Sequence, residues 1–322
     1  MNARKRFHET LSFGTPDRPP LLEEGLREDV LASWKEQGMP QDVELTDLFE
    51  MDKRVRIPIS LDPIPPLKDW HPTQEGLAQY KRAFDPHDTR RWPKDWSEKV
   101  KAWKDSGTIL ELSVHRGLFR TLNVDNWSDF IEVIFAMKDT PGIVKKILDV
   151  ALEFSLAMID QMLSEVSVDY LLFSEPIGGN DRPLISDAMY REFLLPRYRH
   201  MIESAKAWNA EWFCWMTFGN GRVLLPDLVD TGFNVLWACE TETPDMDYLS
   251  IRNEFGEDLR LIGGIDLDAL RGSHEEIRKE VTARVPPLLE SGGYLPVADG
   301  RVRTNMSWTH YSFYRELLQS IV

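Results

Sequence analysis

The chain of 322 residues has little cysteine, too few basic residues to offset its acids, and no long apolar run. Its only cysteines, Cys214 and Cys239, exclude a disulfide-stapled fold and favour a reducing cytoplasm. The net charge of −15 argues against nucleic acid and anionic membrane surfaces as partners. No run reaches the roughly 18 apolar residues of a membrane span. The basic first residues lack the apolar stretch of a signal peptide, so we expect a cytoplasmic protein.

Short apolar runs alternate with segments of helical period, most clearly in the last third of the chain. Such runs, bounded by glycine and followed by helices, are typical of parallel strands buried on both faces. The sequence therefore predicts an α/β fold, a distorted (β/α)8 TIM barrel with an N-terminal helical extension, as a single domain over residues 1–322. The seven predicted strands lie at 21–24, 108–115, 168–175, 212–217, 234–240, 259–266 and 293–299, and Arg54–Ser60 is a candidate for the eighth.

Residues 62–107 interrupt this pattern with an irregular stretch rich in Pro, Asp, Lys and Trp. Long irregular segments inside compact domains are often functional. We interpret this one as an excursion that contains an edge strand and a short helix and lies over one end of the barrel. Its tryptophans, among them Trp92, Trp96 and Trp103, are either half-buried anchors or the lining of an aromatic pocket.

Four acids fall at predicted strand ends: Glu175, Glu240, Asp266 and Asp299. Because the sites of β/α barrels lie at the carboxyl ends of the strands, these carboxylates are candidates for acid–base catalysis or metal binding. The alternative is that each caps a helix or pairs with an arginine. His115 also ends a predicted strand and is a candidate proton donor, metal ligand or structural histidine.

Arginines follow the same strand ends in a chain that is otherwise acidic. Guanidinium groups bind carboxylates and phosphates by paired hydrogen bonds, which indicates an anionic group on the substrate or cofactor. Neutralisation of the nearby acids is the alternative. The predicted substrate-binding residues are Arg116, Arg301, Arg303, Trp215, Phe218 and Glu23.

Four segments resemble one family, the uroporphyrinogen decarboxylase superfamily: Asn2–His8, Asp17–Pro20, Gly263–Asp266 and Leu289–Tyr294. That superfamily also contains methyltransferases that move methyl groups to or from corrinoid proteins and coenzyme M. The resemblance covers nearly the whole chain. It implies a distorted β/α barrel with a deep pocket at the carboxyl end.

The chain departs from the best-known members of that superfamily. True decarboxylases carry Arg-Gln-Ala-Gly-Arg after the first strand, where this chain has the acidic stretch Glu23–Glu28. Zinc methyltransferases carry His-x-Cys-Gly where this chain has Met216–Gly219, and many carry a cysteine near Asp299. The chain thus lacks the standard zinc motif, and its metal stays unknown. A third branch resembles it in Glu175 but differs at Phe218 and Gly300.

The resemblance implies a methyltransferase that moves a methyl group from a small substrate, such as an aromatic ether or an amine, to a separate corrinoid protein. Glu175, Asp299 and His115 would polarise or protonate the leaving group. The alternatives are a decarboxylase of a small carboxylic acid or porphyrinogen-like substrate, with Arg301 or Arg303 holding a carboxylate, and a non-catalytic ligand-binding barrel. A homodimer stays open.

Overall fold

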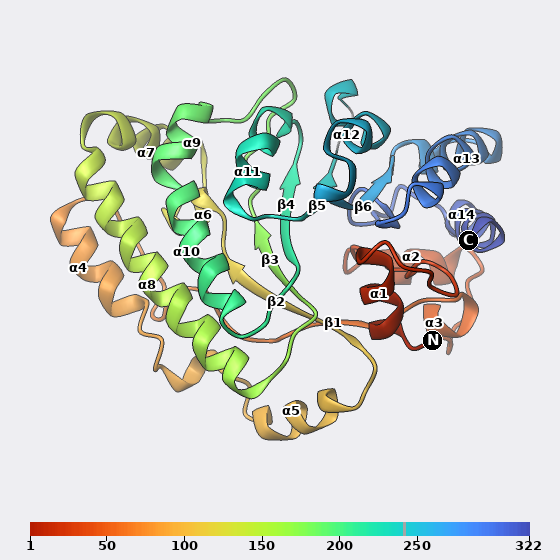
Figure 1. Cartoon of the computed structure of the whole chain (residues 1–322), viewed down its shortest axis with the longest axis horizontal. Helices are drawn as coiled ribbons and strands as arrows, with labels where there is room; N and C mark the ends of the chain where they lie inside the picture. The colour runs from red at the N-terminus through yellow and green to blue at the C-terminus, as the bar shows by residue number, and fades with distance from the viewer. Residues whose placement is uncertain (241–242) are drawn as a thin grey trace.

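The computed structural model describes residues 1–240 and 243–322, and a sheet of seven parallel strands lies at its centre (Figure 1). The strands follow one another across the sheet in chain order, as expected for repeated β/α units. They are β1 (Arg54–Arg56), β2 (Ile109–His115), β3 (Tyr170–Ser174), β4 (Phe213–Phe218), β5 (Val235–Cys239), β6 (Arg260–Ile265) and β7 (Tyr294–Ala298).

Helices link the strands and cover the sheet. Within the described parts of the chain, none is long and apolar enough to cross a membrane. The α-helices are α1 (Ala3–Leu11), α2 (Val30–Glu36), α3 (Leu45–Leu48), α4 (Gln74–Ala83), α5 (Trp96–Lys104), α6 (Leu118–Thr121), α7 (Trp127–Asp139), α8 (Pro141–Glu165), α9 (Asp187–Phe193), α10 (Leu195–Lys206), α11 (Leu225–Thr231), α12 (Tyr248–Phe255), α13 (His274–Glu290) and α14 (Trp308–Ile321). The 3-10 helices are η1 (Thr89–Arg91), η2 (Arg222–Leu224), η3 (Pro244–Met246), η4 (Gly256–Asp258) and η5 (Ala269–Arg271).

The sheet curls into a half-barrel, and the segment 21–27 lies between its two edges, where it bonds to Asp52 just before β1 and to Val302 just after β7. The strand predicted at 21–24 is wrong: the segment makes a single parallel bridge, between Leu26 and Val302. Two backbone hydrogen bonds support this bridge, from Arg27 N to Val302 O at 3.0 Å and from Val302 N to Gly25 O at 3.0 Å. The candidate eighth strand forms only over Arg54–Arg56, as an edge strand, so an eight-stranded barrel stays a prediction.

The two faces of the sheet pack against different layers. Side chains alternate between the faces of a strand, and both faces are apolar here, which explains the unbroken apolar runs of the sequence. Trp215 and Phe173 belong to the larger core between the sheet and the helices. Met216 and Trp237 belong to a smaller core on the inner, concave face, together with Phe7 of α1.

The excursion at 62–107 reaches both ends of the sheet: near its start, Asp62 pairs at 2.9 Å with Arg116, which directly follows β2. It contains α4, which packs against α8, and α5, which directly precedes β2 and therefore lies at the amino end (Figure 1). The Trp96 ring contacts those of Trp92 and Trp103 at 5.0 and 5.7 Å, and its indole N–H donates to Glu165 at the end of α8. These tryptophans anchor the excursion to the helical layer.

Candidate active site

The predicted acids at the strand ends do not form one cluster. Glu240 and Asp299 do lie together, because Glu240 N donates to Asp299 O at 2.7 Å. Glu240 forms an ion pair with Arg303, and the buried Asp299 carboxylate accepts a hydrogen bond from Leu267 N at 2.9 Å. Glu240 has a φ of +51°, in the left-handed region that few non-glycine residues adopt. Such strained residues are concentrated at functional sites.

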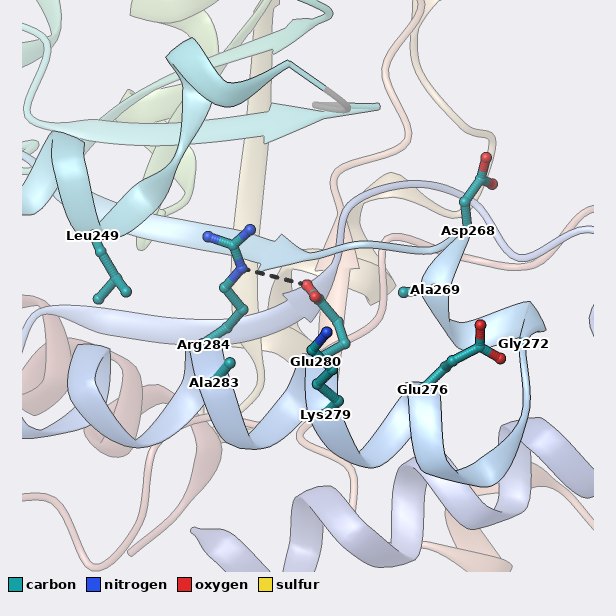
Figure 2. Close-up of a pocket in the computed structure, with 9 residues that line it drawn as sticks. All are labelled: Leu249, Asp268, Ala269, Gly272, Glu276, Lys279, Glu280, Ala283 and Arg284. Atoms are coloured by element: carbon teal, nitrogen blue, oxygen red, sulfur yellow. Dashed lines mark ion pairs between the residues drawn. The ribbon is translucent and has the colours of Figure 1, made fainter.

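Asp266 lies elsewhere, beside the helices that follow β6. Its carboxylate accepts from Asp268 N at 2.7 Å, and its backbone N–H donates to Glu280 at 3.0 Å. Glu280 pairs with Arg284 along a separate cavity of about 450 Å³ between α12, η5 and α13 (Figure 2). Burial raises the pKa of Glu280. Asp266 therefore stabilises a turn next to this outer cavity.

His115 and Glu175 meet Tyr198 of α10, and we call these three residues the outer triad. Tyr198 donates to Glu175, and its hydroxyl lies 2.8 Å from His115 Nε2, which is 3.2 Å from the Glu175 carboxylate. Leu118 N donates to the other oxygen of Glu175 at 2.8 Å. Tyr198 and Glu175 are fully buried, and the Tyr198 ring contacts Phe173 on the outer face of the sheet. The expectation that Glu175 and His115 face the pocket at the strand ends is therefore wrong.

The irregular end of β2 explains the position of His115. The register between β2 and β3 shifts between Ser113 and His115, and a bulge of this kind turns the following side chain to the other face. Burial, and then the charge of Glu175, raise the pKa of Tyr198 well above its ordinary value. Tyr198 therefore stays protonated and acts as a hydrogen-bond donor.

The predicted substrate-binding residues also separate. The prediction that Trp215 binds substrate is wrong, because Trp215 is buried on the outer face. Its indole N–H donates there to Tyr190 at 3.0 Å. Glu23 accepts from Arg315 of α14 at 2.7 Å, away from solvent. Arg116 pairs with an acid of the excursion, and Arg301 pairs with Glu24 at 3.4 Å. Phe218 packs against the inner core.

A charged group that the sequence reasoning missed occupies the inner face, and we call Arg54, Arg56, Glu111 and Tyr170 the inner cluster. Glu111 is fully buried, accepts from Arg54 at 2.5 Å, and also accepts from Arg56 and Tyr170. Burial acts to raise the pKa of Glu111, but the two guanidinium groups lower it below its ordinary value. The sequence signal that could have revealed the inner cluster is Glu111, the one acid inside the apolar run 108–115.

The inner cluster continues toward Glu24 and Trp237. The guanidinium carbon of Arg54 lies 4.9 Å from the centre of the Trp237 ring, a cation–π contact. Burial raises the pKa of Glu24, against the opposing charges of Arg301, Arg54 and Arg56. Among the described residues, Trp237 Nε1 has no hydrogen-bond partner, whereas Glu24 Oε2 faces Arg301 in the ion pair at 3.4 Å. A buried donor is therefore available on this face.

A cavity of about 670 Å³ lies at the carboxyl ends of β3, β4 and β5, and we call it the mouth cavity. Two loops form it through a bridge between Gly179 and Asn220, whose side chain donates to Asp245 at 2.9 Å. A side chain at Gly178 would meet Phe218 O at 2.1 Å, so the loops touch closely there. The described lining residues are Gly178, Gly179, Asn180, Asp181, Phe218, Gly219, Glu240, Thr243, Pro244 and Asp245.

The donor set does not fit a zinc site. Within residues 1–240 and 243–322, no three His, Cys, Asp or Glu side chains gather where they could hold a metal ion. Cys214 and Cys239 are buried on neighbouring strands, and burial raises the pKa of both thiols well above the ordinary value. Zinc binds the thiolate form, which this environment disfavours.

A parallel β/α sheet with a polar cavity at the carboxyl ends of its strands defines the class of β/α barrel-like proteins. Within that class, the model of the uroporphyrinogen decarboxylase (URO-D) family matches residues 127–294, more than half of the chain, so the chain belongs to this family. The superfamily expected from the sequence is confirmed.

One solved structure shows the same fold at low sequence identity. A methyltransferase from Methanosarcina mazei is 17% identical with a TM-score of 0.62, over 100% of this chain and 98% of that one. A B12-independent methionine synthase from Shewanella sp. W3-18-1 is 13% identical with a TM-score of 0.41, over 71% and 66% of the two chains. No curated protein matches the chain. At 17% identity, the first likeness supports the fold alone.

Proposed function

We propose that this chain is a methyltransferase that takes a methyl group from a small methylated amine bound in the mouth cavity and passes it to a corrinoid on a separate protein. Membership of the URO-D family supports a methyltransferase-like role. The observation that carries the choice of substrate is the lining of the mouth cavity, which combines carboxylates with an aromatic ring.

The charge of the mouth cavity favours a cation. Asp181, Glu240 and Asp245 line it, and its described lining residues include no lysine or arginine. Of the three acids, Glu240 is neutralised by Arg303 and Asp245 accepts from Asn220. An aromatic face and nearby carboxylates are the groups that recognise quaternary ammonium ions. Phe218 supplies that face, so a substrate with a methylated ammonium group fits this lining.

A methylated ammonium group also suits the chemistry that the site offers. When the carbon–nitrogen bond breaks, its electron pair stays on nitrogen, and the product is a neutral amine that needs no proton at that moment. An ether would instead leave as an oxyanion, which needs a positioned acid. Of the three expected donors, His115 and Glu175 are held in the outer triad, and Asp299 is buried. A substrate that needs no proton donor is consistent with this arrangement.

A corrinoid, when bound, would supply the nucleophile that accepts the methyl group. The described residues that line the mouth cavity include no histidine that could bind cobalt, and His115 is buried. The chain also lacks the Asp-x-His-x-x-Gly run of corrinoid-binding domains. The residues present therefore fit a corrinoid carried by a partner protein. The chain's own contribution is to bind the ammonium group and orient its methyl group.

The test is calorimetric binding of choline and of its uncharged analogue 3,3-dimethylbutan-1-ol, which has the same shape. We expect choline to bind at least about tenfold more tightly, a difference of about 1.4 kcal/mol. Phe218→Leu should remove most of this preference, and the matched control Phe218→Tyr should keep it. Equal binding of the two ligands would rule out the amine. Transfer itself is followed by the absorbance of a reduced corrinoid protein mixed with the enzyme and choline.

A second candidate function, decarboxylation of a small acid, is favoured by the groups around Glu24. Arg56 and Arg301 are both more than a third exposed and could hold a carboxylate, while burial raises the pKa of Glu24 and favours its proton-donating form. This function predicts release of carbon dioxide without a corrinoid protein. Release that persists in Glu24→Gln would exclude Glu24 as the proton donor.

A further inference from the structure

The ion pair between Arg303 and Glu240 lies beside the mouth cavity. Glu240 directly follows β5 and lines the cavity, and Arg303 follows β7 in the chain. The hydrogen bond from Glu240 N to Asp299 O brings the two loops together. Among the ion pairs of the described residues, only this one includes a residue of the cavity lining. A ligand in the cavity can therefore meet a guanidinium group here.

Both members of the pair keep capacity to bind a ligand. The side chain of Arg303 is 39% exposed, and that of Glu240 is 49% exposed. Arg303 reaches Glu240 through Nη2, and its Nε has no hydrogen-bond partner among the described residues. Because a guanidinium group carries several N–H donors, Arg303 can bind a second carboxylate while it holds Glu240.

The pair determines which charges a ligand should carry. A simple cation at Glu240 would lie next to Arg303, and the two positive charges would share one carboxylate. A zwitterion can place its ammonium group at Glu240 and its own carboxylate at Arg303. The four charges then alternate in sign and sum to zero, which avoids the repulsion between like charges. The pair therefore favours a zwitterion over a cation.

The other acids of the cavity determine the orientation of such a ligand. Asp181 and Asp245 both lie beside Asn220, whose side chain donates to Asp181 O and to the Asp245 carboxylate, each at 2.9 Å. A ligand carboxylate would be repelled by these acids. The methylated ammonium group should thus face the acids and the Phe218 ring, and the carboxylate should lie on the side of Arg303.

The direct contact between Arg303 and Glu240 also limits the length of the ligand. Groups that bind to these two side chains lie close together, because the side chains themselves form an ion pair. The ammonium nitrogen and the carboxylate of the ligand must therefore be joined by a short link, as they are in an amino acid.

We propose that the substrate is a betaine, an amino acid whose nitrogen is fully methylated, and that Arg303 holds its carboxylate. This rests on the proposed function and names the substrate class of the same site. In the reaction a carbon–nitrogen bond breaks, both electrons stay on nitrogen, and the methyl group passes to the nucleophile that the corrinoid supplies. The carboxylate is unchanged, and the product is the amino acid with one methyl group fewer. Arg303 determines specificity and takes no part in the bond changes.

Calorimetric titration of the full chain with four ligands of similar shape tests the proposal. Glycine betaine carries both charges, choline only the positive charge, 3,3-dimethylbutanoate only the negative charge, and 3,3-dimethylbutan-1-ol neither. We expect glycine betaine to bind about fivefold more tightly than choline, as a partly exposed ion pair with Arg303 would give. Glycine betaine should also bind more tightly than 3,3-dimethylbutanoate, which lacks the ammonium group.

Arg303→Gln distinguishes a binding role from a structural one. The change removes the partner of the ligand carboxylate, so glycine betaine should bind about fivefold more weakly. It also frees Glu240, so choline should bind more tightly, and the order of the two ligands should reverse. The matched control Arg271→Gln changes another partly exposed arginine that is paired with an acid, and it should leave both affinities unchanged. Circular dichroism confirms that both variants are folded.

The proposal is overturned if glycine betaine binds no more tightly than choline, or if Arg303→Gln weakens both ligands equally. The titration also separates this failure from a failure of the proposed function. If choline is preferred over 3,3-dimethylbutan-1-ol while glycine betaine gains nothing, only the betaine is wrong. If choline shows no such preference, the methylated amine is wrong and the betaine with it.

Discussion

The inner cluster and the outer triad are two buried polar groups built around the same strands, yet they differ in their access to solvent. In the outer triad, Glu175 and Tyr198 are fully buried and His115 nearly so, beneath α10. In the inner cluster, Glu111 is fully buried, but the side chain of Arg56 that binds it is 53% exposed. Only the inner cluster can therefore exchange its interactions with a ligand.

This difference shows that burial and strand-end position do not by themselves mark a catalytic group. The outer triad satisfies its members internally and joins the sheet to α10, which is a structural role. The inner cluster holds one carboxylate between two guanidinium groups, and it adjoins Glu24 and the indole of Trp237. If the comparison is right, substitutions in the two groups will separate stability from ligand binding.

The largest effect is expected from Glu111→Gln. This change leaves Arg54 and Arg56 without their shared carboxylate, and breaking a buried pair in this way costs about 3–5 kcal/mol. Urea unfolding measures the loss. The control Glu132→Gln, whose ion pair with His71 is exposed, should change stability by less than about 0.5 kcal/mol. A similar small change in both variants would show that the inner cluster contributes little.

The same carboxylate gives a pH dependence with a definite sign. Because the folded pKa of Glu111 lies below its unfolded value, its contribution is present above the unfolded pKa and is lost as the pH falls through the folded pKa. The native chain should therefore lose stability on acidification faster than Glu111→Gln. Parallel unfolding curves for the two proteins across that range would contradict this.

A smaller effect is expected from Glu175→Gln in the outer triad. The amide can still accept from Leu118 N, but its hydrogen bond from Tyr198 loses the charge, which costs about 1–3 kcal/mol. Choline binding in the mouth cavity should be unchanged. Tyr198→Phe, the matched variant, should also lower stability without affecting binding. A loss of binding in either variant would give the triad a part in ligand recognition.

The smallest effect is expected from Glu24→Gln. The folded pKa of Glu24 lies above its unfolded value, so its contribution is present below the unfolded pKa and is lost as the pH rises through the folded pKa. The glutamine variant should match the native chain in acid and be more stable, by less than about 1 kcal/mol, near neutrality. Thermal unfolding at several pH values measures the difference. A native chain that is the more stable near neutrality would contradict the raised pKa.

The sequence predicted the closing strands well, because parallel strands buried on both faces must be continuously apolar. The runs at 212–217, 234–240, 259–266 and 293–299 correspond to β4, β5, β6 and β7. The segment 21–24 was wrongly predicted as a strand, because two leucines followed by two acids match the pattern of a strand that ends in acids. Whether such a segment joins a sheet depends on neighbouring strands that are distant in sequence. The helices of the excursion, α4 and α5, were also only partly expected.

The site was harder to predict, because the face on which a side chain lies depends on its parity and on bulges. Leu172 points inward, so Glu175, three residues further on, points outward, and this could have been counted from the sequence. The face on which His115 lies could not be counted in this way, because it depends on the register shift after Ser113. The pairing of Arg54 with Glu111 follows from the alignment of two strands more than fifty residues apart.

The segment 21–27 has a further consequence for the motions of the half-barrel. One bridge attaches it to Val302 after β7, and one backbone hydrogen bond attaches it to Asp52 before β1. Further contacts come from side chains, such as Arg54, which donates to the carbonyl of Glu23. Amide hydrogens with so few ladder bonds exchange through local opening, well before the sheet unfolds. Because Arg54 binds both this segment and Glu111, we expect each opening to expose the inner cluster to water from the side of the sheet.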